Sequence, residues 1–178
     1  TRHQTARRNV SNYEFSDLGG TWSPDRSRIA FWSTREGSTI LIVNADGTGL
    51  VEVATGLGLA AQFAWSPDGG RIAFAGRVDG AGGEDDVYVI DVDGTGLTQL
   101  TSDPAHEDAP AWSPDGLRIA FSRVAGNGRD ILVMDADGSN VVDLTSSPDE
   151  TDFAPVWSPD GDEIAFISSL SDPSGYHI

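Results

Sequence analysis

The chain has 178 residues, 38% of them hydrophobic, which is enough for one folded domain with its own core. Twenty-eight acidic residues against 11 basic ones, all Arg, give a net charge of −17, and so negative a surface disfavours nucleic-acid binding. The absence of Cys excludes disulfides and zinc–thiolate sites, and no apolar run approaches the ~18 residues that a membrane helix needs.

The tetrapeptide Trp-Ser-Pro-Asp occurs four times along the chain. The copies begin at Trp22, Trp65, Trp112 and Trp157 and lie 43, 47 and 45 residues apart. A fixed period near 45 residues indicates a repeat fold in which each copy forms one structural unit.

Each repeat continues with the same order of short segments. An Ile-Ala-Phe segment follows every turn, and the first three copies then have an aliphatic run at residues 40–43, 87–90 and 131–134. These segments are rich in β-formers, and Asp-Gly pairs at 46–47, 93–94 and 137–138 predict hairpin turns. The first Pro-Asp turn has Arg26 where the others have Gly, so we expect it to be the more strained. The pattern predicts an all-β fold, a β-propeller of about four blades with four antiparallel strands each.

The repeats have the form Pro-x-Trp-Ser-Pro-Asp-Gly-x-x-Ile-Ala-Phe, followed by Ile-Tyr-Val-Met-Asp-like and Asp-Gly-Ser-Asn-like segments. They resemble the repeats of the TolB-like β-propeller family over roughly residues 20–178. The resemblance implies a bacterial binding scaffold, periplasmic or extracellular, that forms part of a ring of six to eight blades. The repeats also resemble the propellers that precede the hydrolase domain of prolyl-oligopeptidase-type peptidases, so the fold alone does not fix the function.

Four blades are expected within residues 20–178. Their predicted bounds are 20–55, 60–101, 108–145 and 152–178, and the fourth is incomplete. Residues 1–19 are assigned to an N-terminal tail or to the outer strand of a neighbouring blade. Three arrangements would cover the apolar faces and strand edges of the end blades: a tight ring of four blades, a homodimer of eight blades if the chain is complete, or a longer propeller. The end of the sequence within a strand favours the longer propeller.

A candidate metal site comes from the position five residues before each Trp. Asp17, Glu107 and Asp152 occupy it in three repeats, and Ala60 occupies it in the second. These residues lie in loops that enter the inner strands at one face, so their carboxylates could converge on Ca²⁺. The alternative, which is favoured, is that they cap turns or solvate loops.

A candidate partner site lies on the same loop face. Arg side chains beside carboxylates could recognise a carboxylated ligand or peptide, although pairing within a blade, with Asp86 or Asp130, is the favoured alternative. The candidate residues are Arg35, Arg77, Arg123, Glu107, Asp108 and Asp152.

Motifs of enzymes are missing from the sequence. There is no Gly-x-Ser-x-Gly, His-Glu-x-x-His or phosphate loop, and His106 has no identifiable nucleophile near it. The sequence therefore predicts a non-catalytic propeller that binds a protein or peptide, with no cofactor required beyond the Ca²⁺ considered above. The alternative is the propeller domain of a larger prolyl-oligopeptidase-type hydrolase, gating substrate access.

Overall fold

The computed structural model describes residues 17–34, 38–55, 58, 62–77, 83–146, 150–169 and 176–177. All regular elements in these ranges are strands, and no helix there is long and apolar enough to span a membrane. Residues 1–16 of the segment assigned to a tail or to the outer strand of a neighbouring blade lie outside the described residues, and β1 begins at Asp17, inside that segment.

The strands follow the repeats. The first blade contains β1 (Asp17–Trp22), β2 (Arg28–Ser33), β3 (Thr39–Asn44) and β4 (Val51–Thr55), and the second contains β5 (Phe63–Trp65), β6 (Arg71–Gly76), β7 (Asp86–Asp91) and β8 (Thr98–Gln99). The third contains β9 (Glu107–Trp112), β10 (Arg118–Ala125), β11 (Gly128–Asp135) and β12 (Val142–Asp143), and the fourth contains β13 (Thr151–Trp157), β14 (Ile164–Ser169) and β15 (Tyr176–His177). Within each blade, successive strands pair antiparallel, which confirms the predicted all-β fold.

The third and fourth blades join into one seven-stranded sheet. The link is a single parallel pairing of β11 with β13, in which the Arg129 amide donates to the Glu150 carbonyl oxygen at 3.0 Å. Gly128 permits this approach, because a Cβ atom there would lie 1.8 Å from the same oxygen.

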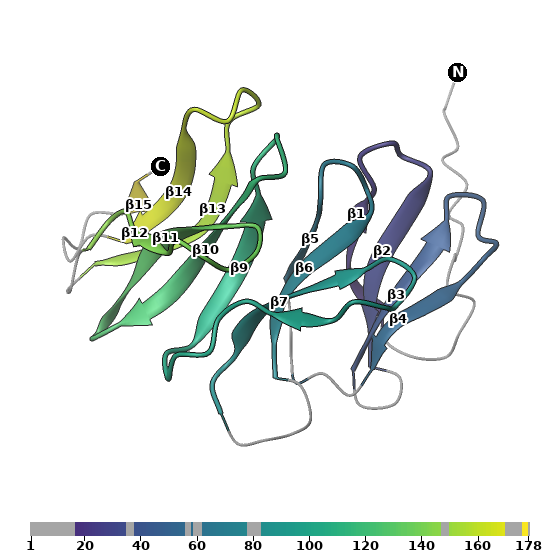
Figure 1. Ribbon diagram of the computed structural model, residues 1–178, viewed down its shortest axis with the longest axis horizontal. Helices are drawn as coiled ribbons and strands as arrows, with labels where there is room; N and C mark the ends of the chain where they lie inside the picture. Colours follow the sequence, from purple (N-terminus) through teal and green to yellow (C-terminus); the bar gives the residue numbers. More distant parts are fainter. Residues whose placement is uncertain are drawn as a thin grey trace.

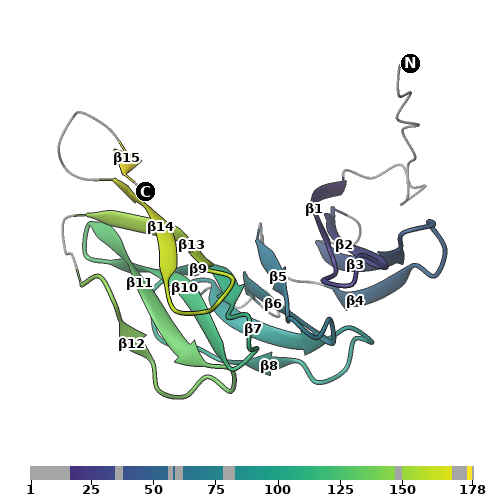
Figure 2. The same cartoon turned by 90° about the horizontal axis from the view of Figure 1, so that it is seen from above.

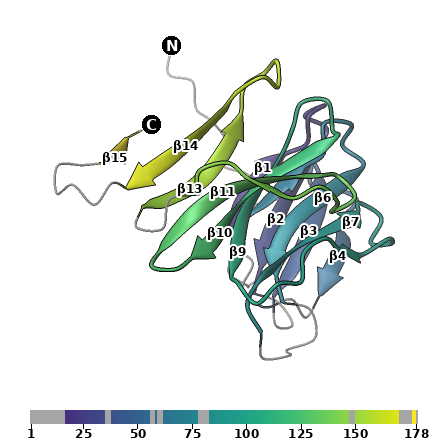
Figure 3. The same ribbon diagram turned by 60° about the vertical axis from the view of Figure 1, so that its left-hand side comes forward.

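The blades stand side by side along an open arc (Figure 1), with the first and fourth blades at its two ends. Seen from above, β4, β8 and β12 lie on the outer side of the arc (Figure 2). The rotated view places β13 and β14 beside the third blade (Figure 3). This is the arrangement of consecutive propeller blades, as predicted.

The hydrophobic core consists of the interfaces between blades. Ile40, Ile42 and Val53 of the first blade pack against Phe74 and the rest of one face of the second blade. The other face of the second blade packs in the same way against the third. The second blade is therefore buried on both faces, and its strands β6 and β7 read as nearly continuous apolar runs.

The repeated Trp residues hold neighbouring blades together. Three Arg side chains at the starts of second strands lie over the indole of the following blade at 4.6–5.1 Å, namely Arg28 on Trp65, Arg71 on Trp112 and Arg118 on Trp157. Such cation–π pairs each contribute about 0.5–1 kcal/mol. Trp32, which lies outside the repeat pattern, is buried in the core between the first two blades.

Candidate functional site

Charged side chains gather at one end of the second and third blades. We call this group the charged cluster, and its members are Arg77, Asp85, Asp103, His106, Glu107, Asp108, Arg123 and Arg129. They come from the β6–β7 segment, the β8–β9 loop and strands β9 to β11. The cluster therefore spans the boundary between two blades.

A β-bulge in β9 positions Glu107. The register of β9 against β10 shifts between the pairs Trp112↔Ile119 and Glu107↔Arg123, and Ala109 within this stretch has a φ of +52°. The bulge adds one residue, so Glu107 and Trp112 point to the same face although they are five positions apart. Glu107 is thus directed toward the second blade.

Glu107 is fully buried, with 0% exposure, and has three partners. Arg123 Nε donates to its Oε1 at 2.8 Å, Arg123 Nη2 lies 2.7 Å from the same oxygen as an ion pair, and the Thr101 hydroxyl donates to Oε2. Its backbone amide donates to the carbonyl oxygen of Asp85 at 2.8 Å. Burial raises the pKa of Glu107 above its ordinary value, and the hydrogen bonds from Thr101 and Arg123 oppose that rise.

Two further ion pairs extend the charged cluster toward solvent. Arg123 Nη2 also contacts Asp103 Oδ2 at 2.5 Å. Arg77 Nε donates to Asp85 Oδ1 at 2.8 Å, and its Nη1 donates to the Gly83 carbonyl oxygen at 2.9 Å. The side chains of Arg77 and Asp103 are 43% and 37% exposed, so both remain accessible to a ligand.

His106 joins the two blades through carboxylates on either side of its ring. Its Nδ1 lies 3.4 Å from Asp85 Oδ2, and its Nε2 lies 3.5 Å from Asp108 Oδ2. Arg129 forms an ion pair with Asp108. The imidazole is held between acidic groups contributed by neighbouring blades.

Carboxylates outnumber guanidinium groups at this surface. Glu84, whose side chain is 58% exposed, approaches the His106 ring at 4.0 Å and adds to the acidic side chains of the charged cluster. All three Arg side chains of the cluster already have a carboxylate partner. The arrangement can therefore attract a cationic group more readily than a carboxylate.

Residues 18–173, most of the chain, match the TolB beta propeller domain. The chain belongs to this family. Among solved structures, an Agrobacterium tumefaciens protein assigned as TolB is 30% identical with a TM-score of 0.74, and the match covers 88% of this chain and 55% of that one. TolB from Acinetobacter baumannii is 23% identical with a TM-score of 0.75, over 94% of this chain and 41% of that one. This TolB-family chain thus spans about half the length of these two proteins.

More distant structures share the fold alone. A chain of the nidogen/laminin complex is 12% identical with a TM-score of 0.65, and the match covers 90% of this chain and 63% of that one. No curated protein sequence matches this chain significantly.

The three predicted Ca²⁺ ligands have different surroundings in this TolB-family propeller. Glu107 is bound to Arg123 and Thr101, whereas Asp17 and Asp152 each have a buried Oδ1 without a hydrogen-bond partner. Within the part of the chain that the structure describes, no three acidic or His side chains form a group able to hold a metal ion. The Ca²⁺ site stays a prediction.

The predicted partner-binding residues are brought together only in part. Arg77, Arg123, Glu107 and Asp108 belong to the charged cluster, while Arg35 lies outside the described residues. Asp152 lies in β13 of the fourth blade, apart from the contacts that define the cluster.

Three members of the charged cluster were missed by the sequence reasoning. Asp85 pairs with Arg77, whereas Asp86 accepts a hydrogen bond from Gln99 at 2.9 Å. Asp103 and Arg129 were also not singled out. The small residues three positions before Trp22, Trp112 and Trp157 have positive φ values and lie at the bulges, but they do not point to these three side chains.

Proposed function

We propose that this TolB-family propeller is a non-catalytic scaffold that binds a protein or peptide partner through the charged cluster. The observation that carries the proposal is the contrast between the buried inner part of this surface and its exposed rim. Glu107 and the neighbouring blades hold the inner part in place, while Arg77 and Asp103 of the cluster and the adjacent Glu84 form the exposed rim. Charged side chains on rigid strands and loops are pre-organised for recognition.

The partner that fits this surface carries a basic segment. The exposed rim has two carboxylates for one guanidinium group, and the whole chain has a net charge of −17. A positive partner would be steered to it by long-range attraction, and the association would weaken as salt is added.

The family resemblance supports a periplasmic location for this binding role. The nidogen/laminin complex provides an example of a chain of similar fold in a complex between proteins. Family membership and fold support the scaffold, and the charged cluster supports the choice of surface.

A capture experiment tests the proposal. Wild-type chain is immobilised and exposed to a periplasmic extract of Agrobacterium tumefaciens, beside the Glu84→Gln/Asp103→Asn variant, which removes two exposed negative charges. The control variant Glu52→Gln/Glu163→Gln changes the net charge equally at exposed positions away from the charged cluster. We expect a bound protein that the cluster variant loses and the control retains, whereas equal capture by both variants would contradict the proposal.

A further inference from the structure

A small pocket lies between the second and third blades, each of which has all four strands in place. Its volume is about 390 Å³, at the low end of the range typical of small-molecule sites. Its apolar lining comes from Val89, Leu100 and Ala136, and its charged lining comes from Arg71, Asp91 and Asp137. Arg71 begins β6 and Asp91 ends β7, so the pocket lies at the opposite end of these strands from the charged cluster.

The guanidinium group of Arg71 is held in place without the use of its hydrogen-bond donors. It lies over the Trp112 ring at 4.7 Å. In the two neighbouring interfaces, the equivalent Arg28 and Arg118 also donate from Nη2 to the carbonyl oxygen of a turn, at 2.8 and 3.3 Å. Arg71 makes no such bond within the described residues, and Asp68 attracts it only at longer range. Its N–H groups are therefore available to a ligand.

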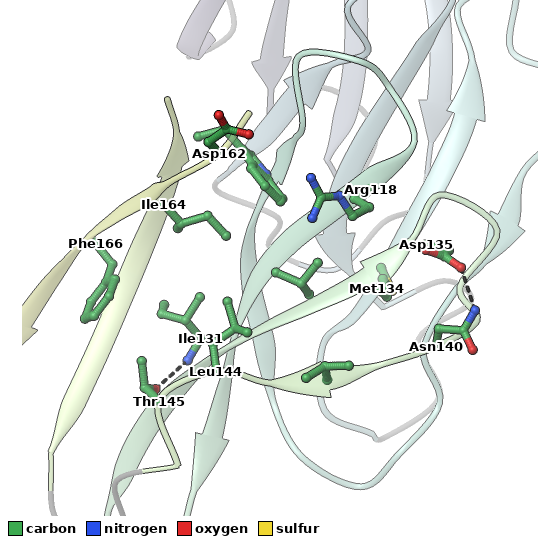
Figure 4. Close-up of a pocket in the computed structure, with 13 residues that line it drawn as sticks. Arg118, Ile131, Met134, Asp135, Asn140, Leu144, Thr145, Asp162, Ile164 and Phe166 are labelled. Carbon is green, nitrogen blue, oxygen red and sulfur yellow. Dashed lines mark hydrogen bonds between the residues drawn. The ribbon is translucent and has the colours of Figure 1, made fainter. Parts of the chain in front are cut away.

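The carboxylate of Asp91 has no hydrogen-bond partner within the described residues, although the equivalent side chains of both neighbouring blades have one. In the first blade the position is Asn44, whose Nδ2 donates to a Thr hydroxyl of its own turn at 3.1 Å. In the third blade, Asn140 Nδ2 donates to Asp135 Oδ2 at 2.6 Å (Figure 4). The second blade has Gly96 at the position of Asn140, which leaves the space beside Asp91 open.

A small side chain leaves the apolar part of the pocket open. The residue after the third strand packs against the preceding blade, and it is Val92 in the second blade and Ala136 in the third. The two positions are equivalent, because each amide donates to a carbonyl oxygen at the turn before the second strand of its own blade, at 3.0 and 2.9 Å. A Val at the position of Ala136 would occupy part of the space beside Val89 and Leu100. The pocket therefore departs from the repeat in both charge and size.

We propose that this pocket binds a free α-amino acid with an aliphatic side chain. The α-carboxylate accepts hydrogen bonds from Arg71, and the α-ammonium group donates to Asp91 and Asp137. Arg71 and Asp91 lie directly opposite each other in the β6–β7 pair, so their Cβ atoms are about 5 Å apart. This separation suits the two charges that an amino acid carries on one carbon atom. The aliphatic side chain of the ligand lies on Val89, in the space beside Ala136.

The charge balance of the pocket favours a ligand that carries an ammonium group. Two carboxylates face one guanidinium group. Hydrogen bonds from the Ser139 hydroxyl and amide lower the pKa of Asp137, so this carboxylate is ionised at neutral pH. A ligand with a carboxylate alone would leave both acidic side chains without a cation.

L-Leucine is the probe, and two analogues that each lack one charge are the controls. Leucinamide keeps the ammonium group without the carboxylate, whereas isocaproate keeps the carboxylate without the ammonium group. Binding is followed by amide NMR shifts of the 178-residue chain. We expect saturable shifts at Arg71, Asp91 and Ala136 with leucine. Either analogue should bind at least about 10-fold more weakly, because it leaves a charged group of the pocket unpaired.

Two substitutions copy residues that the chain already has at the equivalent positions. Asp91→Asn copies Asn44 of the first blade, and Ala136→Val copies Val92 of the second. Both variants should fold, as an amide spectrum unchanged away from the pocket would show. Both should bind leucine about 10-fold more weakly, the first by removing a charge and the second by filling space. Asp135→Asn, the same change in the third blade, should bind leucine like wild type.

Several outcomes would overturn the proposal. These are no saturable shift with leucine, shifts confined to other parts of the chain, or leucine binding that Asp91→Asn leaves unchanged. Leucinamide that binds as tightly as leucine would show a site for cations alone, and isocaproate that does so would show a site for carboxylates alone. Either result contradicts an amino-acid site. Because the charged cluster is unchanged in all these samples, failure here would leave the proposed partner surface untouched.

Discussion

The Ser of each Trp-Ser-Pro-Asp turn closes the turn through its side chain. Ser23 Oγ donates to Asp25 Oδ1 at 2.6 Å and accepts from the Arg28 amide at 2.9 Å. The same pair of bonds recurs in the other three turns, from Ser66, Ser113 and Ser158. The carboxylate thereby gains several donors although it is exposed to solvent.

These donors should be visible in the titration of Asp25. Hydrogen bonds from the Ser23 side chain and from the Ser27 amide and hydroxyl lower the pKa of Asp25 from 3.8 to about 2. Because the pKa of Asp25 is lower in the folded state, its ionisation stabilises the fold at pH values above the ordinary pKa of a carboxyl group. This contribution is lost as pH falls from about 4 to about 2.

Carboxyl-carbon NMR measures the prediction directly. The Asp25 midpoint should lie near 2 in the wild-type chain and should rise toward 3.8 in Ser23→Ala. Ser38→Ala, which changes a Ser outside the turn, serves as the control and should leave the midpoint unchanged. A wild-type midpoint near 3.8 would show that the turn bonds are not formed in solution.

Turn contacts of this kind could be predicted from the sequence because they join residues at most five positions apart. The strained first turn is one example, since Arg26 has a φ of +59° where the other turns have Gly at +69° to +79°. The pairing of Arg77 with Asp85 rather than Asp86 could not be predicted in this way, because it depends on how the loop before β7 is folded.

At the scale of strands, the bulge in β9 creates the Glu107–Arg123 pair. Removing Arg123 alone leaves a buried carboxylate without its cation. We expect Arg123→Ala to destabilise the fold by about 3 kcal/mol at pH 7, the low end for a broken buried pair because Arg123 is partly exposed. The double variant Glu107→Gln/Arg123→Met should regain most of that loss.

The pH dependence of the Arg123→Ala variant gives a second test of the pair. The pKa of Glu107 is already raised by burial, so the folded variant takes up a proton more readily than the unfolded chain. The loss of unfolding free energy in Arg123→Ala relative to wild type should therefore shrink as pH falls from 7 to 5. Urea unfolding measures both effects, and an equal loss at the two pH values, or in the single and double variants, would refute the account.

The burial of Glu107 could not be read from its position in the sequence. Simple alternation along a strand places residues five positions apart on opposite faces, whereas the bulge returns Glu107 to the face of Trp112. The blade itself was predictable because the 45-residue repeat encodes the strand order, and the structure confirms it.

At the scale of the whole molecule, the chain forms an arc whose first blade exposes Trp22 at 55%. In the three interfaces described above, an Arg of the preceding blade stacks on the Trp. The fourth blade has Glu163 at the position of that Arg. Closing blade four onto blade one, in a ring of four or in a two-chain ring of eight, would set a carboxylate against the negative face of the Trp22 ring.

Substitution of Glu163 tests this reasoning about ring closure. Glu163→Arg would supply the missing cation, and we expect it to strengthen self-association of the chain roughly 2- to 5-fold relative to Glu163→Gln. Sedimentation equilibrium measures the change. Indistinguishable association of the two variants would mean that Glu163 does not meet Trp22 and that the argument against closure fails.

The most direct test of the account is the dissociation constant of the captured partner. It should be about 5- to 10-fold weaker for Glu84→Gln/Asp103→Asn than for wild type at low salt, because the partner loses two charges that attract it. The difference should narrow as NaCl is raised, and Glu52→Gln/Glu163→Gln should bind like wild type. Equal dissociation constants for wild type and the Glu84/Asp103 variant at low salt would contradict the claim that the charged cluster is the binding surface.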